Sequence, residues 1–170
     1  MKNKRKVISY RRKREGKTNY KKRMNILSSG IPRLVIRKSL KNITAQIIGY
    51  EPKGDKVLAC ASSKEIMKLG WKFSGCNTPC AYLVGYLAGK KAKEKKINEA
   101  VLDLGLYQPI KGSKFYAALK GAVDAGLNIP HEESVIPKQE RIKGKHIADY
   151  KKIEIEKAFD DILSKIKVKR

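Results

Sequence analysis

The chain has 170 residues, a length typical of one folded domain. Its 40 Lys and Arg residues outnumber 16 Asp and Glu residues, and the formal net charge of +24 favours a polyanionic partner. No run reaches the roughly 18 apolar residues of a membrane-spanning helix. The basic N-terminus also lacks the apolar segment of a secretory signal. We therefore expect a cytoplasmic protein with no membrane partner.

The basic charge is concentrated at the N-terminus, where residues 1–23 contain twelve cations opposed only by Glu15. This segment has few large apolar side chains, and their burial cannot offset the entropy lost on ordering it. We therefore expect the segment to be extended or disordered until it binds an anion. Tyr10 and Tyr20 lie among these cations, which favours stacking on unpaired RNA bases together with phosphate contact. A solvated basic tail or an import signal is the alternative interpretation.

Three short β-branched runs follow the basic segment and predict an antiparallel meander. The runs are Pro32–Lys38, Ile43–Ile48 and Val57–Ala61, and turn-forming residues separate the second from the third. Because alternate residues of a strand face the same side, Arg33 and Arg37 should lie on one face of the sheet.

A helix is predicted to begin at residues 77–79, with Thr78 as its cap and Pro79 as its first residue. Ala81, Gly85 and Gly89 form a ridge of small residues, which we expect to pack closely on the sheet. The buried-strand pattern at residues 99–105 then predicts a parallel crossover, and hence a mixed sheet.

The rest of the chain is predicted to be mainly helical. Residues 111–113 introduce a helix that ends at Gly126, and residues 130–150 form an irregular, partly helical connection. A final amphipathic helix begins near Ile153 and directs five apolar residues inward, namely Ile155, Ala158, Phe159, Ile162 and Ile166.

Catalytic and metal sites receive little support from the sequence. Asp103 in a buried strand could hold Mg²⁺ in a nuclease, but no second or third carboxylate stands on a neighbouring strand, so pairing with a cation or a backbone amide is favoured. The only histidines, His131 and His146, belong to no recognisable nucleophile motif. The three cysteines lack zinc-site spacing, which favours Cys76 and Cys80 as small buried residues. We expect no enzyme and no cofactor.

Two predicted helix starts could receive a phosphate at their unpaired N–H groups. They are Asn77-Thr78-Pro79 and Lys111-Gly112-Ser113, and ordinary capping is an equal alternative for each. Trp71 could stack on a base, but a lone tryptophan is as often a packing residue.

Five blocks, in order, resemble the archaeal-type ribosomal proteins of the L-eighteen family, whose eukaryotic counterpart is L-five. The blocks are residues 11–20, 32–39, 75–83, 100–106 and 111–127. Cysteine at positions 76 and 80 departs from the small residues expected there, which indicates different local packing.

The resemblance implies a mixed α/β core of the ribonuclease-H-like, translational-machinery type with a basic, extended N-terminal arm. It implies a non-catalytic protein of the large ribosomal subunit that binds 5S rRNA in the central protuberance, touches 23S rRNA and neighbours other protuberance proteins. The corresponding divisions are an RNA-binding arm at 1–30, an α/β core at 31–130 and a C-terminal helical extension at 131–170.

Carried over by motif, the expected RNA contacts are polar and cationic residues of the arm, the first hairpin and the two helix starts. They are Arg11, Arg12, Arg14, Lys17, Thr18, Asn19, Tyr20, Arg23, Arg33, Arg37, Lys38, Lys41, Asn77, Thr78, Lys111, Gly112 and Ser113. The alternatives are a generic cationic RNA chaperone or assembly factor, and a ribosome-biogenesis nuclease that uses Asp103.

Overall fold

The computed structural model describes residues 7–168 and contains a four-stranded mixed sheet in the order β3-β2-β1-β4. Antiparallel pairing joins β1 to β2 and β2 to β3, whereas β4 runs parallel to β1. The strands are β1 (Arg33–Lys38), β2 (Ile43–Gly49), β3 (Lys56–Ser62) and β4 (Val101–Asp103). The predicted meander and parallel crossover are therefore confirmed.

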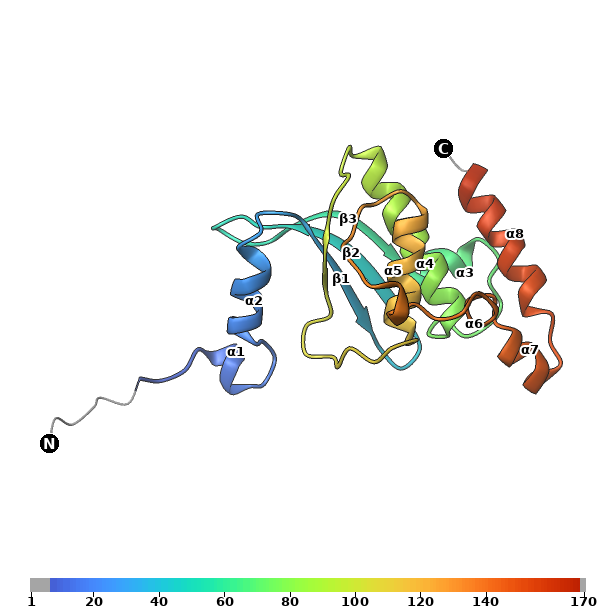
Figure 1. Cartoon of the computed structure of the whole chain (residues 1–170), viewed down its shortest axis with the longest axis horizontal. Helices are drawn as coiled ribbons and strands as arrows, with labels where there is room; N and C mark the ends of the chain where they lie inside the picture. Colours follow the sequence, from blue (N-terminus) through green and yellow to red (C-terminus); the bar gives the residue numbers. More distant parts are fainter. Residues whose placement is uncertain (1–6, 169–170) are drawn as a thin grey trace, which may run out of the picture.

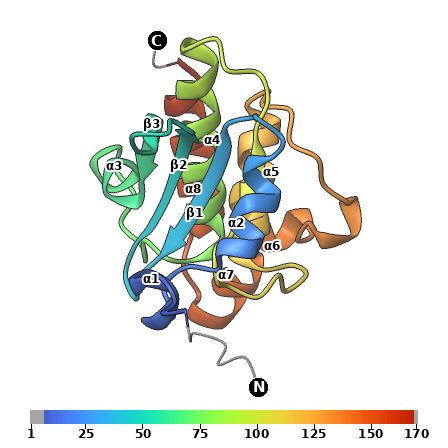
Figure 2. The ribbon, with the colours of Figure 1, turned by 90° about the vertical axis from the view of Figure 1, so that its left-hand side faces the viewer.

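Helices cover both faces of this sheet, as Figures 1 and 2 show. The N-terminal helix α2 lies on one side, α4 and α5 lie on the other, and α8 lies beyond them at the far end of the molecule from α1. The helices are α1 (Arg11–Arg14), α2 (Tyr20–Leu27), α3 (Ser63–Lys68), α4 (Thr78–Glu94), α5 (Lys114–Asp124), the 3₁₀ turn η1 (Glu133–Val135), α6 (Gln139–Lys143), α7 (Lys145–Lys151) and α8 (Ile155–Val168).

Alternate side chains of β1 point to opposite faces of the sheet, one apolar and one charged. Leu34 and Ile36 are fully buried and join the main hydrophobic cluster with α4 and α5. Arg33 and Arg37 share the opposite parity, and both reach Asp103 on β4. The prediction that the two arginines share a face is thus confirmed, and this face is the one that the arm covers (Figure 1).

The ridge of small residues on α4 packs against α5, not against the sheet as predicted. A Cβ atom at Gly85 would collide with the backbone carbonyl of Ala118, and one at Gly89 would lie 2.8 Å from the carbonyl oxygen of Ala122. Gly121 of α5 meets the carbonyl of Tyr82 in the same way. The cost of about 1 kcal/mol per helical glycine is therefore offset by a close contact between two helices.

Local signals at two helix starts differ from the prediction. Asn77, not Thr78, caps α4: its Oδ1 accepts a hydrogen bond from the backbone N–H of Cys80 at 2.9 Å. Helix α3 was not predicted, although Ser62 and Glu65 form a capping box at its start. Both differences arise because several capping residues stand close together in the sequence.

The C-terminal extension, here residues 131–168, contains the predicted irregular connection and final helix. Helix α8 begins at Ile155, two residues after the predicted start, and buries Ile155, Phe159, Ile162 and Ile166. Ala158 is only partly buried. The ring of Phe159 lies 5.5 Å from that of Tyr82 on α4, so the apolar face of α8 extends the hydrophobic core beyond the helix layer.

The close crossing of α4 and α5 predicts that Gly121→Ala destabilises the fold. Alanine improves helix propensity by about 1 kcal/mol, but overpacking against the Tyr82 backbone costs about 1–3 kcal/mol, so we expect a lower free energy of unfolding in urea. Ser164→Ala, on the exposed face of α8, is the control and should change stability little. A Gly121→Ala protein as stable as the wild type would contradict the close packing.

Candidate nucleic-acid interface

The N-terminal arm, residues 7–30 in the structure, is folded and docked and not extended as predicted. Within it, α1 and α2 are helical, and the side chain of Asn19 caps α2 by accepting a hydrogen bond from the backbone N–H of Lys22 at 3.1 Å. The Lys22 ammonium donates to the carbonyl oxygen of Gly105 at 3.2 Å. The arm therefore contacts the loop after β4. Residues 1–6 of the predicted arm lie outside the described residues.

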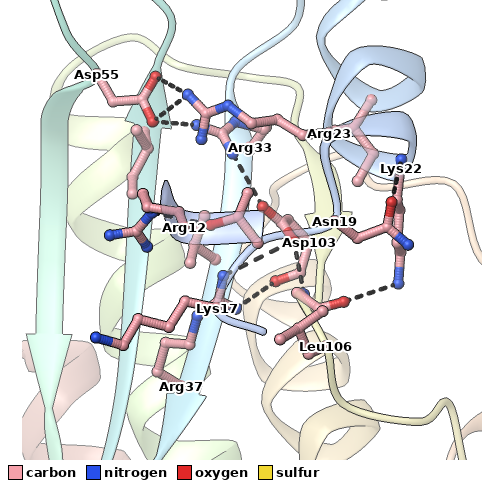
Figure 3. Close-up of a pocket in the computed structure, with 15 residues that line it drawn as sticks. Arg12, Lys17, Asn19, Lys22, Arg23, Arg33, Arg37, Asp55, Asp103 and Leu106 are labelled. Atoms are coloured by element: carbon pink, nitrogen blue, oxygen red, sulfur yellow. Dashed lines mark hydrogen bonds and ion pairs between the residues drawn. The ribbon is translucent and has the colours of Figure 1, made fainter. Parts of the chain in front are cut away.

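A chain of ion pairs fastens the arm to the sheet (Figure 3). Arg33 on β1 donates to Asp103 at 2.9 Å and to Asp55 at 2.7 Å. Arg23 on α2 donates to both oxygens of the Asp55 carboxylate, at 2.9 and 2.8 Å. The order Arg23–Asp55–Arg33–Asp103 thus links α2, the turn before β3, and two adjacent strands.

Asp103 is fully committed to this structural role. Its second carboxylate oxygen accepts a hydrogen bond from the backbone N–H of Gly105 at 2.7 Å, while Arg37 donates to its backbone carbonyl at 3.1 Å. Gly105 has a φ of +62°, and a Cβ there would lie 2.9 Å from a terminal nitrogen of Arg37. The predicted pairing of Asp103 with a cation or a backbone amide is confirmed, and both kinds of partner are present.

The charge state of Asp55 follows from its two arginine partners. Burial by itself would raise the pKa of this carboxyl group, but the hydrogen bonds and positive charges of Arg23 and Arg33 outweigh it and lower the pKa below its ordinary value. A lowered pKa stabilises the folded state at neutral pH, and this contribution is lost as the pH falls below about 4 through the folded-state pKa.

A cavity of about 190 Å³ lies between the arm and the charged face of the sheet (Figure 3). Two carboxylates and six cations line it, so its surroundings are strongly positive. The cations are Arg12, Lys17, Lys22, Arg23, Arg33 and Arg37, and the carboxylates are Asp55 and Asp103. A site with this excess of guanidinium and ammonium groups is suited to phosphate groups.

The outer surface of the arm presents further cations and an aromatic pair. Arg11 and Arg14 are exposed, and Arg12 donates to the Thr18 hydroxyl at 2.9 Å. The rings of Tyr10 and Tyr20 lie 5.1 Å apart at 45°, and 72% of Tyr10 is exposed. Cationic and aromatic side chains therefore stand side by side, the combination that proteins use to recognise unpaired RNA.

Cations of the first hairpin differ in their accessibility. Arg33 is only 3% exposed, which argues against the predicted direct contact with RNA. Its role in the structure is to form the ion pairs with Asp55 and Asp103. Arg37, Lys38 and Lys41 are exposed. The ammonium of Lys38 lies 5.7 Å from the centre of the Tyr107 ring, a cation–π contact that leaves its charge in place.

The two predicted helix starts are not equivalent. The start of α4 is closed: the Asn77 side chain caps it, Thr78 is 9% exposed, and Gly144 before α7 lies close to Pro79. The start of α5 has no side-chain cap, because Ser113 makes no cap hydrogen bond and its hydroxyl is buried without a partner in the described structure; the nearby Lys111 is exposed. Of these two helix starts, only that of α5 lacks a side-chain cap, so phosphate binding there stays a prediction.

Residues considered for other chemistry pack in the core. Trp71 is 3% exposed, and its indole N–H donates to the carbonyl oxygen of Ser74 at 3.1 Å. Cys76 and Cys80 are buried as predicted, and burial, with the nearby Cys76, raises the pKa of the Cys80 thiol to about 12. Among residues 7–168, no group of three His, Cys, Asp or Glu side chains is placed to hold a metal ion.

The described part of the chain also contains no helix that is both long enough and apolar enough to span a bilayer.

Removing the carboxylate of Asp103 should strongly destabilise the fold. Asp103→Asn leaves the buried Arg33 charge with one carboxylate instead of two, and breaking a buried ion pair on one side costs about 3–5 kcal/mol. The free energy of unfolding in urea measures this loss. Asp161→Asn, at an exposed position of α8, is the control. A change below about 1 kcal/mol would show that Arg33 does not depend on Asp103.

Removing the charge of Asp55 should release the arm and also lower the stability of the core, because the buried Arg33 then keeps only Asp103 as a charged partner. In Asp55→Asn at pH 7, Arg23 loses a charged acceptor, and a loss of about 1.4 kcal/mol makes the arm about tenfold more open. Trypsin cleavage within residues 11–23 should accelerate accordingly. Wild-type arm opening, followed by NMR, should rise as the pH falls below about 4, since protonation of Asp55 removes the same attraction.

Glu51→Gln, in the same turn, is the matched control, because Glu51 is exposed and its one ion pair among residues 7–168 is with Lys56 at 3.7 Å. Equal cleavage rates in the Asp55→Asn and Glu51→Gln proteins would show that Asp55 does not fasten the arm.

Comparisons with known proteins identify the family of the chain. A family model for "Ribosomal large subunit proteins 60S L5, and 50S L18" matches residues 4–99 and 90–132. The large ribosomal subunit protein uL18 of Korarchaeum cryptofilum is 47% identical over 161 residues, covering 92% of this chain and 83% of the relative. The uL18 protein of Methanococcus maripaludis is 50% identical over 143 residues, covering 84% and 74% respectively.

These relatives are structural proteins of the cytoplasmic ribosome and not enzymes, which rules out the nuclease alternative. The chain belongs to this family of large-subunit ribosomal proteins.

Proposed function

We propose that this ribosomal protein binds 5S rRNA and helps to anchor it in the central protuberance of the large subunit, where it also touches 23S rRNA and neighbouring proteins. The observation that carries the proposal is the docked arm, which presents cations and two tyrosine rings on a rigid α/β core. We further propose that the α/β core has a ribonuclease-H-like fold.

The proposed mechanism is structural. Exposed cations of the arm, Arg11, Arg12, Arg14 and Lys17, replace condensed counterions on the RNA backbone. The Tyr10–Tyr20 pair stacks on unpaired bases. Because the ion pairs of Arg23 and Arg33 already hold the arm, RNA binding does not need to order these residues, and less affinity is lost to conformational entropy.

The exposed hairpin cations extend the same proposed surface. Arg37 lines the arm cavity, so a phosphate bound there can contact both the arm and β1. Lys38 and Lys41 continue the positive surface past the end of β1. Arg33 contributes indirectly, as a positioning residue that fixes Asp55 and hence Arg23. Thr18 and Asn19 hold the local arm structure through Arg12 and the α2 cap.

Neutralising the exposed cations of α1 tests the proposal. In the triple variant Arg11→Gln, Lys13→Gln, Arg14→Gln, the log–log salt dependence of binding to 5S rRNA should weaken by about 2–3, at 0.7–0.9 per phosphate contact. Filter binding across a salt series measures the slope. The matched control is Lys64→Gln, Lys68→Gln, Lys72→Gln, which removes the same charge from exposed positions around α3.

Two results would contradict the proposal. Equal slopes for the two triple variants would remove the arm as the principal contact. Equal wild-type affinity for 5S rRNA and for an unrelated transcript of the same length would favour a generic cationic RNA chaperone.

A further inference from the structure

The sheet has one long edge to which no strand is added among the described residues. Strand β3 has seven residues and pairs with β2 on one side only, and Figure 2 shows it at the side of the sheet next to α3. The opposite edge is less open, because β4 has three residues and backbone hydrogen bonds join Asn128 to Asn98 and Ala100 just before it. An unpaired edge strand is a template for pairing with another chain. The outer edge of β3 is therefore the place where self-association is expected.

Two lysines of α4 occupy carbonyl groups along this edge. The ammonium of Lys91 donates to the carbonyl oxygen of Cys60 at 2.8 Å, and the ammonium of Lys95 donates to the carbonyl oxygen of Leu58. Alternate residues of a strand direct their backbone groups to the same edge, so Leu58 and Cys60 present successive acceptors there. Both acceptors already have a donor from within the chain.

An N–H group of the same edge is occupied by Glu65. Its Oε1 accepts a hydrogen bond from the backbone N–H of Ser62 at 3.2 Å, and its Oε2 pairs with Lys91 at 2.5 Å. Ser62 is two residues beyond Cys60, so its N–H faces the same outer edge. The side chains of Lys95, Lys91 and Glu65 thus follow the edge in order, and we call them the edge cover.

The spacing of the two lysines on α4 fits the spacing of the carbonyl groups on β3. Residues four apart on a helix lie on one face about 6 Å apart along its axis, and residues two apart on a strand are about 6.8 Å apart. The helix and the strand run in opposite directions here, because the later lysine meets the earlier strand residue. One pair of lysines on a helix that packs on the sheet can therefore reach two successive edge carbonyls.

The lysines of the edge cover differ from the exposed cations of α1. The side chain of Lys91 is 33% exposed, and the carboxylate of Glu65 opposes its charge. Both ammonium groups are directed at backbone carbonyls of β3, and a lysine held in one geometry loses rotamer freedom. Charged side chains, lysine above all, are a means by which natural proteins block pairing at an edge strand.

We propose that the edge cover keeps the free protein monomeric by blocking strand addition to β3, and that β3 of a second copy occupies the edge when the cover is removed. An added strand needs the carbonyl groups of Leu58 and Cys60 as acceptors, and the edge cover already holds them. The second copy fits because its β3 presents the same edge, and two identical edges pair with two-fold symmetry. This device acts whichever RNA the protein binds.

The test is the mass of the full chain in solution after both lysines lose their donor groups. The open-edge variant is Lys91→Met, Lys95→Met. The control variant is Lys64→Met, Lys68→Met, which removes the same charge and adds the same apolar side chains at exposed positions of α3. Size-exclusion chromatography with light scattering measures the mass up to about 1 mM protein. Salt of about 0.5 M screens the repulsion between copies, and a reductant keeps the cysteines, which are free in the structure, reduced.

The wild type and the control variant should stay at the monomer mass of 19.2 kDa, and the open-edge variant should approach about twice that mass as its concentration rises. The conservative variant Lys91→Arg, Lys95→Arg keeps a charged donor on each side chain and should remain monomeric.

A labelled peptide with the sequence of residues 56–62 tests the edge directly. It should bind the open-edge variant at least about tenfold more tightly than it binds the wild type. The control peptide carries Ala59→Pro and Cys60→Pro, which removes one N–H from each of its edges, and it should bind neither protein. A purely structural role of the lysines would not change peptide binding.

Three outcomes would overturn the proposal. Dimerisation of the wild type as readily as the open-edge variant would show that the cover does not block pairing. Equal dimerisation of the control variant would assign the association to the added methionines. A folded open-edge variant that stays monomeric and binds the peptide no better than the wild type would leave the lysines a structural role only.

Urea unfolding checks that each variant folds. If the double variant does not fold, Lys95→Met replaces it, because Lys95 is exposed and this change removes only its contact with Leu58. The same peptide and the same criteria then apply: tighter binding than to the wild type supports the proposal, and equal binding overturns it.

Discussion

The buried guanidinium of Arg33 imposes the requirement on which the charged side of this fold depends. A cation that is 3% exposed cannot be left without counter-charges, because its lost hydration must be replaced. Asp103 on the neighbouring strand supplies one carboxylate and Asp55 before β3 supplies another. The Nε of Arg33 still has no partner in the described structure, so neither carboxylate is redundant.

The position of the arm follows from how Arg33 is satisfied. Asp55 has oxygen lone pairs that Arg33 does not use, and Arg23 on α2 occupies them with two hydrogen bonds. The same carboxylate therefore serves the core and the arm. In a chain of net charge +24, a basic segment would otherwise be repelled from the sheet. One acidic turn residue offsets that repulsion and holds α2 on the sheet, while Arg11, Lys13 and Arg14 of α1 stay exposed.

The sequence was sufficient to predict features that depend on local periodicity. The parity of Arg33 and Arg37, the parallel strand that carries Asp103, and the apolar face of α8 were all predicted from spacing. The role of Asp55 was missed, because its partners are 22 and 32 residues away in sequence and no local pattern indicates such a pairing.

The arm and the glycine ridge were predicted wrongly for related reasons. Composition indicated an extended arm because the segment itself contains few apolar residues to bury. Composition does not show the contacts that the segment makes with the rest of the chain. Helix α2 of the arm has partners outside the segment, because Arg23 pairs with Asp55 and Lys22 donates to Gly105. The ridge at Gly85 and Gly89 correctly indicated close packing, but the sequence of α4 cannot specify whether its neighbour is a strand or the α5 helix.

Docking before binding changes what salt does to this protein. The Arg23–Asp55 pair is only about one-third exposed, and partly buried pairs are screened less than exposed charges. The cations of α1 are exposed, so their attraction to RNA weakens first as salt increases. If the proposed function holds, the arm therefore stays on the core at salt concentrations that release RNA from α1. The salt dependence of RNA binding would then report phosphate contacts and not folding of the arm.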